Sequence, residues 1–341
     1  MRILYLVLFS SLVVGSSSAQ IASSELSSDS DIDYFLKQAF FAKISADRVA
    51  LNHIGIESKK TEGGHLITAV LEGYPAHAHD IRRGDIIKFV DGSPFHPVES
   101  FNFEKDNDGN FLPTKQEHKL VVFRSDFSME LSVTPVYENL FDSYRSATSN
   151  SVLEFSAGNK TIGYVRFWAL SRSTNDIINY QTILAELDDT DGIIFDFRNG
   201  LGFLDPQHLD LIFPNRSNYF SYSYASGSFI DFAKASPNST VSPYRKPIAV
   251  LINEGTRGGT ELFAYQLDKL QRVVSLGEAT RGEISNYLFG DSFRKEELRI
   301  DGKLFHNNSI SPEKIITYPY ENTERGDPQF DAAINALLGI I

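Results

Sequence analysis

Residues 251–265 read LINEGTRGGTELFAY, and this stretch decides how the second half of the chain folds. The apolar run that ends at Ile252 is typical of a buried strand, and the residues from Gly259 onward have the apolar spacing of a helix. Gly258 and Gly259 would expose backbone amides at the start of that helix, beside Arg257. Such a position attracts anions. The alternative is a tight turn with a solvated Arg257.

Apolar strands alternate with helical segments on both sides of this turn. The pattern predicts an α/β domain with a mostly parallel sheet over residues 150–338. Strands are expected at TIGYVRFWAL (161–170), DGIIFDFRN (191–199), KPIAVLINEG (246–255) and RVVSLGE (272–278), and helices at DIINYQTILAEL (176–187) and GGTELFAYQLDKL (258–270).

The preceding part of the chain has shorter, alternating strands. Residues 50–138 predict a β-rich domain, with strands at Leu66–Leu71 and Ile86–Val90 closed by turn-forming residues. A polar leader and a helix are expected before it, over residues 20–49, because apolar residues have helical spacing from Asp33 to Asn52.

The chain begins with a pattern typical of export. A basic residue, an apolar stretch and small residues near Ala19 predict a signal peptide over residues 1–19 and a secreted or periplasmic product. The 341 residues contain no cysteine, so neither a lipidated-cysteine anchor nor a disulfide framework is expected. No other segment is apolar and long enough to span a membrane. The formal net charge of −12 argues against nucleic-acid binding.

Residues 50–136 resemble a PDZ domain. The resemblance rests on Gly55-Ile56, on Gly73 to Ala76 before a short helix, and on Arg83-Gly84-Asp85 with Val90-Asp91-Gly92 after it. It implies that Gly55 and Ile56 belong to a loop that binds a peptide's terminal carboxylate while the peptide adds a strand to the sheet. Packing or regulation of the neighbouring domain is the alternative role.

The second domain resembles the carboxy-terminal processing, or tail-specific, serine peptidases, whose α/β core follows a PDZ domain. Five blocks carry the resemblance in order: 162–166, 196–199, Asn253 with Glu261, 277–282 and 310–313. The resemblance implies the fold of that family and partners that are peptides or protein C-termini.

The catalytic positions of the family are degenerate in this chain. The resemblance places the serine nucleophile at Gly258 and the lysine base at Glu283, and glycine has no atom that attacks a carbonyl. The oxyanion region keeps Gly202 but has Phe203 in place of a second glycine. We therefore expect an inactive homologue, with Gly202, Arg257, Gly258 and Gly259 as candidate anion-binding residues.

Two other functions stay open. An active peptidase with an altered dyad could use a displaced hydroxyl of Thr256 or Thr260 with His306 as base, although Thr260 is better placed to cap the helix. The second open function is that of a carrier of small apolar ligands, since retinoid-binding proteins of the eye resemble this core fold. The histidines show no metal-ligand spacing, so neither a metal nor another cofactor is expected.

Overall fold

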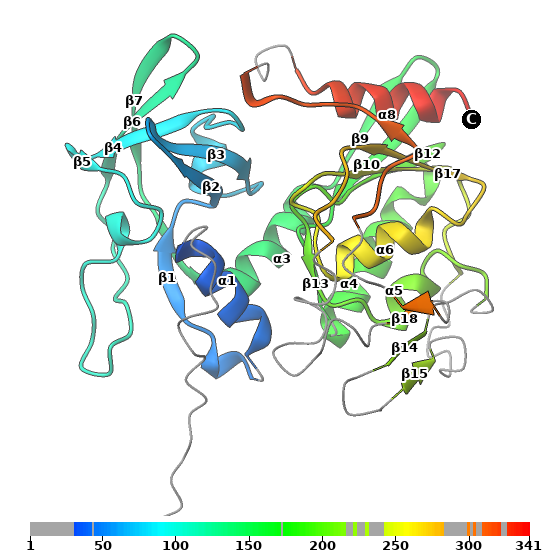
Figure 1. Ribbon diagram of the computed structural model, residues 1–341, viewed down its shortest axis with the longest axis horizontal. Helices are drawn as coiled ribbons and strands as arrows, with labels where there is room; N and C mark the ends of the chain where they lie inside the picture. Colours follow the sequence, from blue (N-terminus) through cyan, green and yellow to red (C-terminus); the bar gives the residue numbers. More distant parts are fainter. Residues whose placement is uncertain are drawn as a thin grey trace, which may run out of the picture.

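The computed structural model describes residues 31–42, 44–171, 173–215, 221–223, 229–231, 242–282, 299–300, 303–304, 309–321 and 326–341. The expected signal peptide, Glu283 and His306 lie outside these residues. The chain forms a β-rich unit and a mixed α/β unit, which stand on opposite sides of Figure 1. The mixed α/β organisation predicted from the sequence is thus confirmed.

The β-rich unit contains an antiparallel sheet with strand order β2-β3-β4-β6-β7, to which β5 adds on β4. Strand β2 is therefore an edge strand. Strands β1 and β8 form a separate antiparallel pair. The elements are β1 (Ala50–His53), β2 (Ile56–Thr61), β3 (Gly64–Val70), α2 (Pro75–Ala78), β4 (Ile86–Val90), β5 (Ser93–Pro94), β6 (His118–Arg124), β7 (Phe127–Val133) and β8 (Val136–Asn139).

The α/β unit is built on a six-stranded sheet with order β20-β17-β16-β12-β10-β9. All neighbours in it are parallel except β9 and β10. Its elements are β9 (Leu153–Ala157), β10 (Lys160–Arg166), β11 (Ala169–Leu170), α4 (Thr174–Glu186), β12 (Gly192–Asp196), β13 (Leu201–Gly202), α5 (Pro206–Asp210), β16 (Ile248–Ile252), α6 (Gly259–Leu267), β17 (Val273–Gly277), β20 (Lys314–Ile315) and α8 (Pro328–Leu338). Two short antiparallel pairs are formed, one by β14 (Ser221–Ser223) with β15 (Phe229–Asp231) and one by β18 (Arg299–Ile300) with β19 (Lys303–Leu304).

Helices cover both faces of this sheet (Figure 1). Because side chains alternate between the faces of a strand, Ile193 and Phe195 pack with helices α4 and α6. Ile194, between them, packs on the other face against Leu337 of α8. The central strands β12, β16 and β17 are buried throughout, which explains their continuous apolar sequences.

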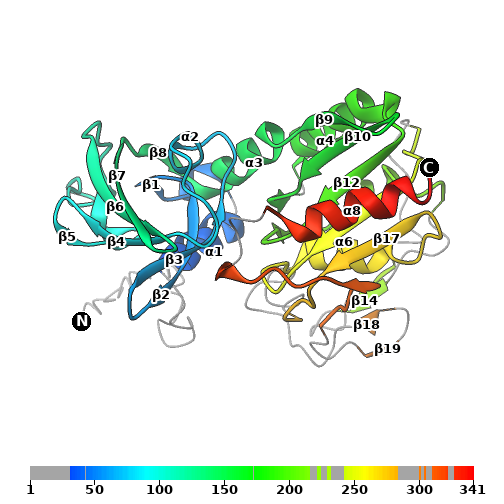
Figure 2. The same ribbon diagram turned by 90° about the horizontal axis from the view of Figure 1, so that it is seen from above.

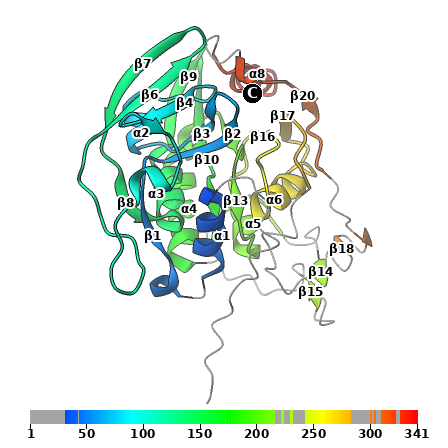
Figure 3. The same cartoon turned by 60° about the vertical axis from the view of Figure 1, so that its left-hand side comes forward.

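Two helices join the units. Helix α3 (Leu140–Asn150) runs from β8 of the β-rich unit to β9 of the α/β unit (Figure 2). Helix α1 (Asp31–Phe41) packs on it through the ring of Phe40, which lies 5.0 Å from that of Phe141. Helix α1 also lies beside β13 (Figure 3), where the rings of Phe41 and Phe203 are 5.9 Å apart.

The helix expected from Asp33 to Asn52 is shorter than predicted. It ends at Phe41, and residues 50–53 instead form β1, paired with β8. This pairing joins segments far apart in sequence, so tertiary contacts override a local helical spacing. Within the described part of the chain, no helix combines the length and apolar composition needed to cross a bilayer.

Candidate functional site

Two asparagines meet where adjacent parallel strands end. Asn199 follows β12 and Asn253 follows β16, and the register of the two strands brings them together. The Asn199 amide donates to Asn253 Oδ1 at 3.0 Å, and Asn253 Nδ2 donates to Asn199 Oδ1 at 2.8 Å. Asn253 Oδ1 also accepts from the amide of Gly255. The pair fixes the start of the turn toward α6.

The threonine hydroxyls of the turn are engaged in holding it. Thr256 is fully buried, and its Oγ1 donates to the Phe197 carbonyl at 2.9 Å while accepting from the Asn253 amide at 3.0 Å. Thr260 Oγ1 lies 3.0 Å from the carbonyl of Arg257 and donates to it. Contrary to the expectation from the sequence, Thr260 does not cap the helix. The N-cap residue is Gly258, which has no side chain to form a capping hydrogen bond.

Gly258, which the sequence resemblance aligns with the family nucleophile, has a backbone conformation that favours glycine. Its φ is 64° and its ψ is −125°, and α6 begins at the next residue. Gly259 has a steric requirement of its own. A Cβ at Gly259 would lie 2.6 Å from the carbonyl oxygen of Gly202 and 2.6 Å from the amide of Leu204. The first turn of α6 therefore packs directly on the backbone of residues 202–204.

Residues 201–203, where the resemblance places the oxyanion region, are held by β11. The Phe203 amide donates to the Leu170 carbonyl at 2.8 Å, so this donor is engaged. Gly202 has a φ of 109°, and a Cβ there would lie 2.1 Å from the same carbonyl oxygen. The ring of Phe203 packs in the cluster around α1 and α3. Phe203 thus contacts helix α1 through the ring of Phe41.

Arg257 is not solvated, because it reaches Glu57 of β2. Arg257 Nη2 lies 3.3 Å from Glu57 Oε1, and both side chains are largely buried. Glu57 Oε1 also accepts from the Tyr144 hydroxyl at 2.6 Å, and its Oε2 accepts from Asn199 Nδ2 at 2.9 Å. Burial, and then the charge of Glu57, raise the pKa of Tyr144 well above its usual range. The guanidinium group of Arg257 at the candidate anion site is thus already paired with a carboxylate of the chain itself, that of Glu57.

A second contact from the same face of β2 reaches the turn. Residues 57 and 59 point to one side of the strand, and Lys59 pairs with Glu254. The hydrogen bond from Lys59, together with its charge, lowers the pKa of Glu254 despite partial burial. The sequence interpretation missed Glu57, Lys59 and Tyr144. The alternation within β2 is the signal that places Glu57 and Lys59 on one face.

The predicted peptide-carboxylate loop makes internal contacts. Gly55 has a φ of 77°, and its amide lies 3.1 Å from His53 Nδ1, to which it donates. The other ring nitrogen of His53 lies 3.0 Å from Ser143 Oγ of α3. Ile56 is buried and pairs with Val70 of β3. His53 therefore connects this loop to the helix that joins the units.

Glu261 fixes the segment that ends at Gly282. It is fully buried in the first turn of α6, and its Oε1 accepts from the Thr280 hydroxyl and from the Gly282 amide. Thr280 Oγ1 also accepts from the Ile310 amide at 2.8 Å. Glu283 follows Gly282 directly but lies outside the described residues. The structure therefore describes the segment that leads to position 283, up to Gly282.

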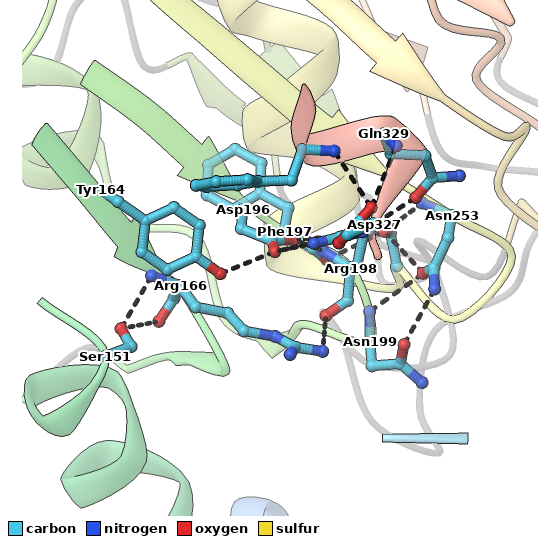
Figure 4. Close-up of polar contacts among 12 residues, drawn as sticks. Ser151, Tyr164, Arg166, Asp196, Phe197, Arg198, Asn199, Asn253, Asp327 and Gln329 are labelled. Carbon is cyan, nitrogen blue, oxygen red and sulfur yellow. Dashed lines mark hydrogen bonds and ion pairs between the residues drawn. The ribbon is translucent and has the colours of Figure 1, made fainter. Parts of the chain in front are cut away.

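A buried ion network lies beside the asparagine pair (Figure 4). Arg198 Nη2 lies 2.6 Å from Asp196 Oδ2, and Arg198 Nη1 lies 2.6 Å from Asp327 Oδ2. Tyr164 donates its hydroxyl to Asp196 at 2.8 Å. Although burial opposes it, the charge of Arg198 lowers the pKa of Asp196. Among the described residues, no cluster of three or more histidine, aspartate or glutamate side chains could hold a metal ion.

Comparison with known proteins is consistent with this arrangement. Residues 161–287 match the model of peptidase family S41. A carboxyl-terminal-processing protease of Synechocystis is 25% identical over 202 residues, covering 55% of this chain and 46% of the relative. The carboxy-terminal processing protease CtpA of Bacillus subtilis is 23% identical over 280 residues, covering 78% of this chain and 56% of the relative. The chain thus spans about half the length of these relatives.

The fold is shared with a solved structure of an S41 protease from Bacteroides fragilis. The TM-score is 0.55 at 15% identity, and the match covers 85% of this chain and 84% of the other. At this level of identity the likeness concerns the fold alone.

Proposed function

Since the chain contains a peptidase family S41 domain and is homologous to carboxyl-terminal processing proteases, we propose that it is an exported member of this group that does not cleave peptide bonds. Its proposed role is to bind peptides or protein C-termini. The export part of the proposal rests on the signal-like sequence of residues 1–19.

The observation that carries the proposal is the position of Gly258. It precedes α6 where the family nucleophile is expected, and it offers no side chain. The two nearby hydroxyls, of Thr256 and Thr260, both donate to main-chain carbonyls. A hydroxyl needs an adjacent base to become a nucleophile, and a carbonyl oxygen is not such a base. This geometry supports the absence of a displaced nucleophile in the turn.

The proposed binding element is the β-rich unit acting as a PDZ domain. Strand β2 lies at the edge of its sheet, which suits strand addition by a peptide. The Gly55 amide already donates to His53 Nδ1, so a carboxylate that uses this donor has to displace His53. We therefore expect weak binding of free C-termini.

A carrier of apolar ligands would need a larger cavity than the one enclosed near His208. This cavity, lined by Phe167, Phe195 and Phe263 among others, measures about 10 Å³. About one water-sized probe fills such a volume. This cavity is thus too small for an apolar ligand, and the proposal of peptide binding is supported by the edge position of β2.

The test uses the mature chain and pairs of peptides that differ only in a free or amidated C-terminus. Calorimetric titration should detect the free acids alone, and mass spectrometry of the same mixtures should find the peptides intact. Equal binding of acids and amides would remove the carboxylate-loop proposal. Cleavage of either peptide would remove the proposal of inactivity.

A further inference from the structure

A pocket of about 200 Å³ lies between the two units, next to the asparagine pair. One wall is formed by β3 and the turn after α2, and the other by the carboxyl ends of the parallel strands and the start of α8. Six charged side chains line it: Arg82, Arg83, Arg166, Arg198, Glu278 and Asp327. The lining thus has four cations and two anions.

Two of these arginines are satisfied by protein carboxylates. Arg198 uses its Nε and both terminal nitrogens on Asp196, Asp327 and Gln329. Arg82 donates from Nε and Nη2 to Asp80, each at 2.8 Å, and is exposed. Neither arginine therefore requires a ligand in the pocket.

Arg83 and Arg166 also have partners, since Arg83 donates to the Tyr318 carbonyl and Arg166 Nη1 lies 3.5 Å from Glu72 Oε1. Each still retains one buried nitrogen without a hydrogen-bond partner among the described residues: Nη1 of Arg83 and Nε of Arg166. Leaving a buried charged donor unpaired is unfavourable, and native proteins pair such groups with protein atoms, water or ions. The unpaired donors of Arg83 and Arg166 come from the two different units that enclose the pocket.

Both guanidinium groups are held in place by aromatic rings. Arg83 lies over the rings of Tyr318 and Tyr320, at 4.2 and 3.9 Å from their centroids, and donates to the Tyr318 carbonyl. Arg166 lies 3.7 Å from the ring centroid of Trp168. Burial lowers the pKa of Arg83, and nearby Arg198 adds to this effect. A bound anion would raise the pKa of Arg83 and so oppose both effects.

We propose that this pocket binds a small oxyanion, a carboxylate or a phosphate group, through Arg83 and Arg166. Guanidinium groups present planar donors that match the oxygens of these groups. The volume is below the roughly 300–1,000 Å³ of pockets for drug-sized ligands, so the ligand is a small anion or the anionic end of a larger molecule. The site is separate from Gly258 and does not depend on the proposed lack of catalysis.

The test is a calorimetric titration of the mature protein with sodium phosphate and with sodium succinate, at constant ionic strength set with sodium chloride. The wild type should bind at least one of the two anions. Arg83→Gln and Arg166→Gln should each weaken binding about tenfold, since each removes a charged hydrogen bond. Arg245→Gln, which removes an exposed arginine away from the pocket, should stay within about twofold.

Three further measurements keep the result unambiguous. Near-ultraviolet circular dichroism reports whether each variant is folded. If a Gln variant is not folded, the Arg→Lys variant at the same position takes its place. The Lys variant should still bind the anion several-fold more weakly than the wild type. A peptide acid that competes with phosphate while its amide does not would identify a peptide terminus as the source of the anion. Wild-type protein that responds to neither anion, or folded pocket variants that bind like the wild type, would overturn the proposal.

Discussion

Glu57 of the β-rich unit and Arg257 of the α/β unit form a buried ion pair 3.3 Å apart, directly beside the position where a family nucleophile is expected. Tyr144 and Asn199 donate to the same carboxylate. The contact links the edge strand β2 to the start of α6, next to the second ion pair that Lys59 of β2 forms with Glu254. A ligand that needs Arg257 has to compete with Glu57.

Replacing both partners of this buried ion pair should destabilise the protein less than the two single replacements added together. Glu57→Gln leaves Arg257 buried without its counter-charge, and we expect a loss of about 3 kcal/mol in the free energy of unfolding. Glu57→Gln with Arg257→Leu should lose less than the sum of the single changes. Denaturant unfolding of the four proteins measures this coupling, and strict additivity would show that the pair contributes nothing.

Introducing a hydroxyl at position 258 should strain the turn. A serine there has to adopt the φ of 64° and ψ of −125° observed for Gly258, which costs on the order of 1–3 kcal/mol. The melting temperature of Gly258→Ser should therefore fall below that of the wild type.

The double variant Gly258→Ser with Glu283→Lys should recover weak peptidase activity at best. The Phe203 amide is engaged by Leu170, and each missing oxyanion donor costs roughly 10²–10³ in rate. Phe203→Gly leaves this backbone amide on the Leu170 carbonyl, so adding it should not raise the activity measured on an unstructured substrate. Robust cleavage by the double variant alone would show that the oxyanion region is intact.

Any side chain at position 202 should destabilise the protein. Its Cβ would lie 2.1 Å from the Leu170 carbonyl oxygen at a φ of 109°, so Gly202→Ala should destabilise by about 1–3 kcal/mol or more. Gly63→Ala is the matched control, because its Cβ would meet an atom at 3.9 Å, and it should change stability by less than about 0.5 kcal/mol. Thermal unfolding compares them, and equal effects would contradict the close approach of β11 and β13.

Acidification should weaken the contact between the β-rich unit and α3. Burial lowers the pKa of His53 to about 4 from its ordinary 6.5, while Nδ1 accepts from Gly55 and is unprotonated. The unfolded chain takes up a proton first as the pH falls below 6.5. The neutral histidine therefore contributes stability above pH 6.5, and this contribution, about 3 kcal/mol, is lost by about pH 4. A nuclear magnetic resonance titration that found an ordinary pKa for His53 would contradict this.

The sequence predicts the elements of the fold better than the contacts between them. Strand Ile86–Val90 is found with the predicted bounds, because its apolar residues end at Asp91-Gly92, a strong turn signal. The helix predicted to continue beyond Phe41 does not, since β1 pairs with the distant β8. Local pattern holds no information on such pairing.

The same limit applies to the candidate site. Gly258 and Gly259 are found at the start of a helix as predicted, because small residues after an apolar strand identify such a turn. The partner of Arg257 could not be predicted, since Glu57 lies 200 residues earlier in the chain and on another unit. The sequence places Arg257 beside the start of helix α6, and only the tertiary structure identifies Glu57 as its counter-ion.

The most direct test of the central claim is intact-mass spectrometry of an unstructured protein substrate incubated with the purified protein. The account predicts that the substrate mass stays unchanged and that Thr256→Val and Thr260→Val behave like the wild type. Fragments that form in proportion to the concentration of this protein, and that disappear in Thr256→Val or Thr260→Val but persist in the matching Thr→Ser variant, would contradict it. They would show that a displaced hydroxyl cleaves peptide bonds beside Gly258.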